Sequence, residues 1–155
     1  MRNLFHSTCI RSRVLQTLCL TVLVGAPQVL AQTERQHLNG PNKPANAPFS
    51  DAVLAGNTLY ISGSGGFDST GKLPENPADE ARNLMENFKR TLALAGMTMD
   101  DLVAVTVYCP DLALYDTFNA VYRSYFEGPP PSRAFIGSAP LLFGMRFEMQ
   151  GIAVK

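Results

Sequence analysis

Residues 102–108 form a nearly apolar run with a helical pattern on each side of it. A strand this apolar is buried on both faces, so the sheet that contains it needs cover on both sides. Residues 77–96 before the run and residues 111–128 after it carry apolar side chains at helical spacing. Because each helical pattern follows a strand pattern, both helices are expected to lie on one face of a single sheet.

Further strand patterns flank this central part of the chain. Residues 53–62 predict a hairpin around Gly56 and Asn57, and residues 133–138 and 146–154 predict two closing strands. The resulting order, β-β-α-β-α-β-β, predicts an α+β fold: a two-layer sandwich with a mixed sheet and two helices on one face. The second face of the sheet also needs cover, which in so small a domain indicates oligomerisation.

The N-terminal segment, residues 1–31, has the pattern of a cleaved secretory signal peptide. It carries three arginines and no acid, an apolar stretch at residues 14–24, and small residues before Gln32. The apolar stretch is shorter than the roughly 20 residues of a membrane span, although an uncleaved anchor stays open as the alternative. Residues 32–47 predict an extended arm with room for one short strand, and residues 48–155 a single domain. We therefore expect a periplasmic or secreted protein with no membrane contact after cleavage.

The composition of the chain beyond residue 31 excludes several classes of function. It holds 10 basic and 13 acidic residues, because the first segment takes three of the 13 basic residues and no acidic one. This acidic balance gives no electrostatic footprint for nucleic acid. Cys109 and His37 are the only cysteine and histidine left, which argues against an intrachain disulfide, a zinc cluster and a histidine-based triad. The chemistry should then use arginine, glutamate, backbone groups and water, with no metal and no cofactor.

Arg133 is the main candidate for ligand binding. It is a lone cation that enters an apolar strand, and a guanidinium is costly to bury unless it meets a carboxylate or another anion. Taken alone, such an arginine is more often a structural ion-pair partner than a ligand clamp. Glu148, on the last strand, is the candidate proton acceptor, and Arg146 on the same strand face is its competing ion-pair partner.

Five short motifs in a fixed order give these residues a context. They are residues 47–53, residues 59–63, the spaced Asp79, Asn83 and Asn87, residues 115–122, and residues 131–134 followed by residues 147–149. Together they resemble the motifs of the RidA/YjgF family, the reactive-intermediate imine deaminases, from about Pro48 to the C-terminus. The resemblance implies a chorismate-mutase-like homotrimer with three equivalent clefts at the subunit boundaries.

The resemblance also implies roles for particular residues. By this likeness Arg133 pairs with the substrate carboxylate, and Glu148 orients the attacking water together with backbone groups near Ser62 and Gly63. Asn119 lines the same cleft. The alternatives for these residues are a plain ion pair for Glu148, the end of a strand for Ser62 and Gly63, and a solvent-facing position for Asn119.

Four positions depart from the family pattern and bear on substrate preference. Phe49 stands where the family usually has tyrosine, and Phe135 stands where many members have a small residue. By strand alternation Phe135 shares a face with Arg133, so we expect it to narrow the pocket. Ser64 and Gln150 replace a common glutamine and a second glutamate.

Two functions follow from these observations. The first is hydrolysis of 2-imino acids, of the 2-iminobutanoate and 2-iminopropanoate type, to 2-oxo acids and ammonia. The second is a non-catalytic trimer that binds small carboxylates in its clefts or another protein on its surface. An endoribonuclease, a label that some relatives carry, ranks third because the chain has no basic patch and no histidine in its core.

Overall fold

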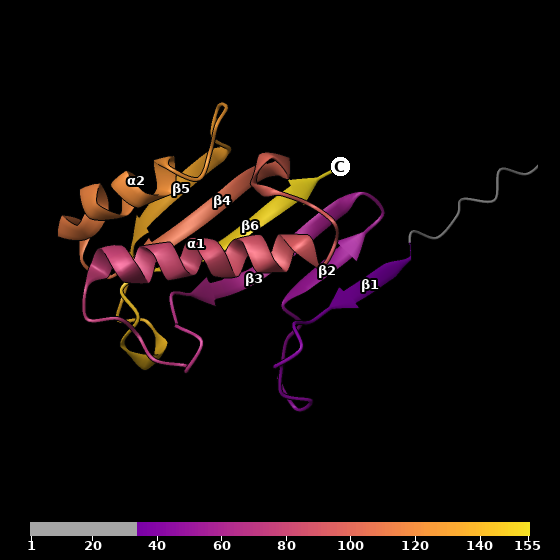
Figure 1. Ribbon diagram of the computed structural model, residues 1–155, viewed down its shortest axis with the longest axis horizontal. Coiled ribbons are helices and arrows are strands. Elements are labelled where there is room, and N and C mark those ends of the chain that lie inside the picture. The colour runs from indigo at the N-terminus through magenta and orange to yellow at the C-terminus, as the bar shows by residue number, and fades with distance from the viewer. Residues whose placement is uncertain (1–33) are drawn as a thin grey trace, which may run out of the picture. The chain divides into compact units, whose positions relative to one another are not determined.

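The computed structural model describes residues 34–155, and the predicted signal peptide lies outside these residues. Six strands form one sheet in the order β1-β2-β3-β6-β4-β5 (Figure 1). They are β1 (Arg35–Leu38), β2 (Ala52–Ala55), β3 (Thr58–Gly65), β4 (Leu102–Cys109), β5 (Ser132–Gly137) and β6 (Glu148–Val154). Only the β4–β5 pair is parallel among these neighbours, so the predicted mixed sheet is confirmed.

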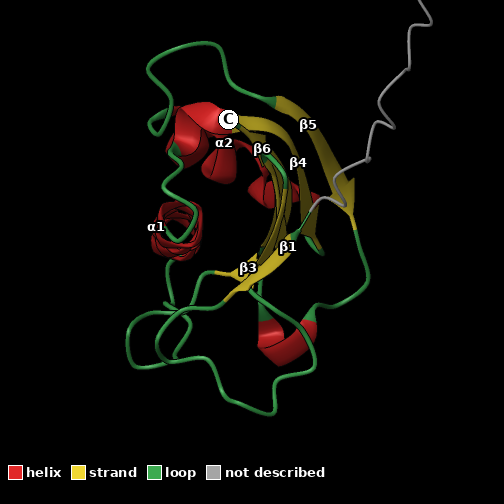
Figure 2. Cartoon of the chain, turned by 90° about the vertical axis from the view of Figure 1, so that its right-hand side faces the viewer, coloured by secondary structure: helices red, strands yellow, loops and turns green. Residues whose placement is uncertain are grey.

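The two helices, α1 (Pro77–Ala93) and α2 (Tyr115–Arg123), lie on one face of the sheet, as expected (Figure 2). Asn76 caps α1, because its side chain accepts a hydrogen bond from the backbone N–H of Ala78 at 2.9 Å. Gly96, with a φ of 63°, ends the helical region in a conformation that suits glycine. No helix within residues 34–155 is long and apolar enough to cross a membrane.

The second helix is shorter than the predicted range of residues 111–128. Asp111 accepts a hydrogen bond from the N–H of Ala113, and the chain first makes a 3-10 turn, Leu112–Leu114. At the other end Ser124 donates to the carbonyl oxygen of Val121 at 2.7 Å. Local hydrogen bonds of short polar side chains therefore set both limits of α2, and the apolar spacing alone does not reveal them.

The hydrophobic core lies between the helices and the inner face of the sheet. Strand β6 shows the division, since Met149 and Ala153 are buried whereas Gln150 is exposed. Fully buried aromatic rings of α1, α2 and the segment before β6, namely Phe88, Phe118 and Phe147, fill the space between the two layers.

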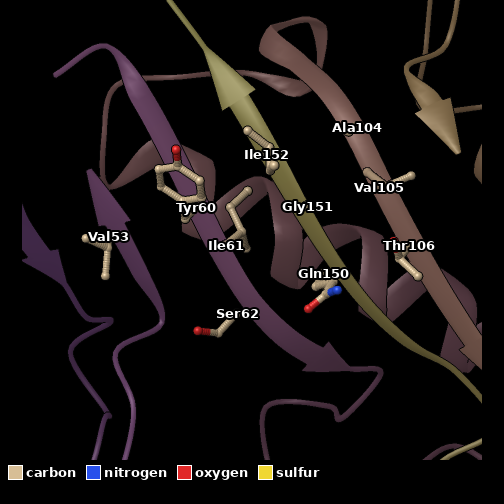
Figure 3. Close-up of a pocket in the computed structure, with 10 residues that line it drawn as sticks. All are labelled: Val53, Tyr60, Ile61, Ser62, Ala104, Val105, Thr106, Gln150, Gly151 and Ile152. Carbon is tan, nitrogen blue, oxygen red and sulfur yellow. The ribbon is translucent and has the colours of Figure 1, made fainter. Parts of the chain in front are cut away.

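The outer face of the sheet carries no helix within residues 34–155 (Figure 2). A groove of 430 Å³ runs over it, with Tyr60 and Ser62 on β3 and Gln150 and Ile152 on β6 among its lining residues (Figure 3). Tyr60 is 51% exposed there. Exposed apolar surface on a sheet face is typical of a face that another chain covers.

Candidate functional site

Arg133 lies on the inner side of the edge strand β5, facing α2. The parallel pairing of β4 and β5 sets Arg133 beside the buried Val105. Its Nη2 donates a hydrogen bond to Oδ1 of Asn119 on α2 at 2.7 Å. The structure therefore brings together two of the predicted site residues, and Asn119 is buried rather than facing solvent.

Three aromatic rings surround the guanidinium. The Cζ atom of Arg133 lies 4.6 Å from the ring centre of Tyr122, 5.6 Å from that of Phe135 and 5.9 Å from that of Tyr115. Such cation–π contacts favour the charged arginine while keeping water away from it. The expectation that Phe135 shares a face with Arg133 is confirmed.

The two tyrosines were not predicted as part of the site. Tyr122 falls within the helical pattern predicted for residues 111–128 and was not singled out there. Tyr122 lies three residues after Asn119 and therefore on the same face of α2. This spacing was the signal in the sequence that could have placed Tyr122 near the site.

Polar atoms without partners gather around Arg133. Nη1 of Arg133, Nδ2 of Asn119 and Oη of Tyr122 are buried and have no hydrogen-bond partner among the described residues. Burying a polar group without a hydrogen-bond partner is costly, so the unpaired state of these three atoms calls for an explanation. All three can donate a hydrogen bond, because burial raises the pKa of the Tyr122 hydroxyl to about 12 and keeps it protonated. The cluster therefore favours an acceptor such as a carboxylate oxygen or a water molecule.

The buried hydroxyl of Tyr122 gives a test of stability. At pH 7 the Tyr122→Phe variant is expected to be more stable by about 1 kcal/mol, because it removes an unpaired buried group and keeps the ring. The pKa is raised in the folded state, so the wild-type protein loses stability from about pH 10, where the unfolded chain ionises, towards pH 12. Urea unfolding of both proteins between pH 8 and 11.5 should show a shallower loss for the variant, and an equal loss would contradict this assignment.

A second group of predicted site residues lies near the end of β3 and consists of Phe49, Ser62, Gly63 and Glu148. An added Cβ at Gly63 would lie 2.1 Å from Oε1 of Glu148, so the missing side chain makes room for the carboxylate. The hydroxyl of Ser62 donates a hydrogen bond to the carbonyl oxygen of Ser50 at 2.7 Å, so the hydroxyl proton is already engaged. Phe49 is 55% exposed and lies under Nζ of Lys43.

The two groups lie on opposite faces of the sheet in one chain. Arg133 pairs with Val105 and faces the helices, whereas Glu148 pairs with Tyr108 and alternates with the buried Met149. The structure therefore brings together the residues of each group but does not bring Arg133 into contact with Glu148 within the described chain.

Arg146 was predicted as the competing ion-pair partner of Glu148, and this interpretation is wrong. Its Nη1 lies 2.5 Å from Oε2 of Glu80 in the first turn of α1. Glu80 also accepts hydrogen bonds from the backbone N–H groups of Arg146 and Phe147. Since these N–H groups bond to a side chain, β6 begins at Glu148 rather than at residue 146. Glu148 itself makes no salt bridge within residues 34–155.

Glu80 is a fully buried carboxylate that was not among the predicted site residues. The Glu80→Gln variant is expected to lose about 3 kcal/mol of unfolding free energy, because it leaves Arg146 without its buried counter-charge. Urea unfolding measures this loss. Glu86→Gln is the control in the same helix, because the ion pair of Glu86 with Lys89 is long, at 3.7 Å. Similar midpoints for the two variants would show that the buried pair adds nothing to stability.

No group of three or more histidine, cysteine, aspartate or glutamate side chains able to hold a metal ion occurs in the described part of the chain. Cys109 is buried, and its burial raises the pKa of the thiol.

The chain is similar to a known protein family over most of its length. The family model described as "Endoribonuclease L-PSP" matches residues 40–155. The chain belongs to the RidA/YjgF family. The predicted resemblance is thereby confirmed, as is the α+β fold.

Relatives of this RidA-family chain include a "2-iminobutanoate/2-iminopropanoate deaminase" from Mus musculus, 38% identical over 72% of the chain and 84% of the relative. A protein of the same name from Homo sapiens is 36% identical over 72% of the chain and 82% of the relative. The crystal structure of RidA from an Antarctic Psychrobacter species has a TM-score of 0.73 at 34% identity. The match covers 77% of the chain described here and 99% of the Psychrobacter chain. The YjgF structure from E. coli also has a TM-score of 0.73, at 30% identity, covering 77% and 98%.

Proposed function

We propose that this protein is a C=N hydrolase that converts 2-imino acids into 2-oxo acids and ammonia. The relatives named as imine deaminases support the reaction class. The observation that carries the proposal is the state of Arg133, which has no carboxylate partner among the described residues and is oriented by Asn119. A ligand carboxylate would supply the missing counter-charge.

The reaction needs one clamp and one proton acceptor. Arg133 holds the substrate carboxylate and thereby fixes the position of the imine carbon, an effect worth several kcal/mol if the geometry is kept (roughly 100-fold or more). Water adds to that carbon, and Glu148 accepts a water proton and returns it to the nitrogen. In the tetrahedral adduct the hydroxyl proton then moves to the amino nitrogen, the C–N bond breaks to release ammonia, and the hydroxyl oxygen becomes the carbonyl oxygen of the 2-oxo acid.

The site of this reaction is proposed to lie between two copies of the chain. In one chain Arg133 and Glu148 lie on opposite faces of the sheet, so a single subunit does not present both to one ligand. A cyclic trimer resolves this, because each interface then joins two different faces and the ring closes. Arg133, Asn119 and Phe135 of one subunit would face Glu148, Ser62, Gly63 and Phe49 of the next.

The proposed activity is tested with an amino-acid oxidase that makes 2-iminobutanoate or 2-iminopropanoate in situ. The protein from Gln32 onward should accelerate the decay of the imine over a reaction without protein, and light scattering should give the mass of a trimer. Equal decay with and without protein, together with stabilisation of the fold by 2-oxobutanoate, would favour the alternative of a non-catalytic carboxylate-binding trimer.

Export of this enzyme is a separate proposal, which rests on the signal pattern of residues 1–31. The full-length chain should appear in the periplasmic or secreted fraction with Gln32 as its first residue. N-terminal sequencing of the exported form checks this, and a cytoplasmic protein that keeps Met1 would contradict it.

A further inference from the structure

Phe49 is the aromatic member of the group formed by Phe49, Ser62, Gly63 and Glu148, the Glu148 group. Its side chain is 55% exposed, so neighbouring atoms cover only about half of it. The ring has no polar atom that a hydrogen bond could fix, and an exposed side chain can occupy several rotamers. A site that uses this ring to contact the substrate therefore needs another group to hold it.

Hydrogen bonds tie the segment of Phe49 to the strand that borders Glu148. The hydroxyl of Ser62 donates to the carbonyl oxygen of the residue after Phe49 at 2.7 Å. The backbone N–H of Ser62 donates to the carbonyl oxygen of Asp51 at 3.0 Å. The next residue, Gly63, is the one whose missing side chain makes room for the carboxylate of Glu148. The fold therefore connects Phe49 directly to the rest of its group.

A pocket of 480 Å³ lies beside Phe49 and borders the outer face of the sheet. It shares two of its lining residues, Val53 and Ser62, with the groove over that face (Figure 3). Lys43 lines the same pocket together with Phe49. The aromatic ring and this cation therefore lie together at the face of the sheet that carries Glu148.

Lys43 covers the ring of Phe49. Its Nζ lies 3.5 Å from the ring centre, inside the roughly 6 Å limit of a cation–π contact. The side chain of Lys43 is only 11% exposed, so the cation is shielded from most of the water that would weaken this contact. Its Nζ also donates a hydrogen bond to Oδ1 of Asp51 at 2.6 Å, which fixes the ammonium over the ring.

Asp51 is itself anchored by the backbone. Its Oδ2 accepts a hydrogen bond from the N–H of Gly40 at 2.9 Å, and its own N–H donates to Oδ1 of Asn39 at 2.9 Å. The ammonium of Lys43 therefore rests on a partner that is held in place. Because Asp51 compensates its charge, Lys43 is better suited to hold the ring than to bind the substrate anion.

We infer that Lys43 is a positioning residue of the proposed imine site, which holds the ring of Phe49 in the orientation that contacts the substrate. This inference rests on the proposed imine hydrolysis. Without the cation the ring leaves that orientation for part of the time, and the apparent affinity falls by the fraction of molecules that stay competent. The cation–π contact of a partly exposed ring corresponds to roughly a 5-fold change in this fraction.

The test is a double-mutant cycle in the protein from Gln32 onward, with 2-iminobutanoate made in situ by an amino-acid oxidase. Both kcat and KM are measured for wild type, Lys43→Met, Phe49→Ala and the double variant. Lys43→Met should raise KM about 5-fold with little change in kcat. In the Phe49→Ala background it should have no further effect, because the ring that Lys43 holds is absent.

Two further variants at the same position separate the cation from the hydrogen bond. Lys43→Arg should keep a KM close to that of the wild type, since a guanidinium can pair with Asp51 and also lie over the ring. Lys43→Gln can still donate a hydrogen bond to Asp51 but carries no charge, so it should behave like Lys43→Met. Lys72→Met is the matched control and should keep the wild-type KM, because Lys72 is exposed and makes no salt bridge within residues 34–155.

The outcomes separate this inference from the proposed function. No acceleration of imine decay by the wild type would sink the proposed hydrolysis. With an active wild type, an unchanged KM in Lys43→Met or in Phe49→Ala would overturn the positioning role. An equal effect of Lys43→Met in both backgrounds would also overturn it, because Lys43 would then act on the substrate or on the fold without Phe49.

Discussion

The Arg133→Ala variant is expected to lose about 30-fold to 5,000-fold in kcat/KM for 2-iminobutanoate, because removing one partner of a desolvated charge pair costs roughly 2–5 kcal/mol. The arginine is the sole cation in contact with Asn119 among the described residues, and its neighbours are aromatic rings that supply no replacement charge. Water cannot take the place of the guanidinium as the partner of the substrate carboxylate, since Nη1 lies in a buried position. The loss should therefore appear in the clamping of the substrate carboxylate.

The matched control is Arg123→Ala, which removes an exposed arginine from the last turn of α2. It should keep the activity of the wild type. The oligomeric mass of both variants, measured by light scattering, shows whether the assembly is intact. An Arg133→Ala protein that stays assembled and retains full activity would contradict the role of Arg133 as the clamp.

Much of the fold followed from the sequence because its determinants are local. The apolar run at residues 102–108 became β4, the hairpin at residues 53–62 became β2 and β3, and the stripe after Pro77 became α1. Periodicity of apolar residues reports burial directly, and Pro77 and Gly96 act within one turn of their own positions. The limits of α2 were less accurate because they depend on hydrogen bonds of Asp111 and Ser124.

The candidate site was less predictable because its contacts join distant segments. The pair of Arg146 and Glu80 links two charges that no spacing rule connects, so the sequence assigned Arg146 to its neighbour Glu148 instead. Tyr122 was predicted only as part of the helix at residues 111–128, whereas in the fold Cζ of Arg133 lies 4.6 Å from its ring centre. The division of the predicted site residues between two sheet faces likewise depends on strand pairing, which appears only in the folded chain.

Complementation between two inactive variants is the second large effect that we expect. If Arg133 and Glu148 serve the same site from different subunits, neither Arg133→Ala nor Glu148→Gln has an intact site as a homotrimer. In trimers assembled from an equal mixture, half of the subunits contribute an intact Glu148 and half contribute an intact Arg133. About a quarter of the interfaces then combine both residues, since each cyclic interface draws its two faces from different subunits.

The experiment refolds the two variants together and apart, and compares the rate of 2-iminobutanoate hydrolysis per subunit. About a quarter of the wild-type rate in the mixture, against almost none in either homotrimer, follows from a site shared between subunits. If one chain supplied both residues, every subunit in the mixture would carry a defective site and mixing would restore nothing. Since the register places Arg133 and Glu148 on opposite faces of the sheet, the recovery of activity in the mixture decides directly whether a second subunit completes the site.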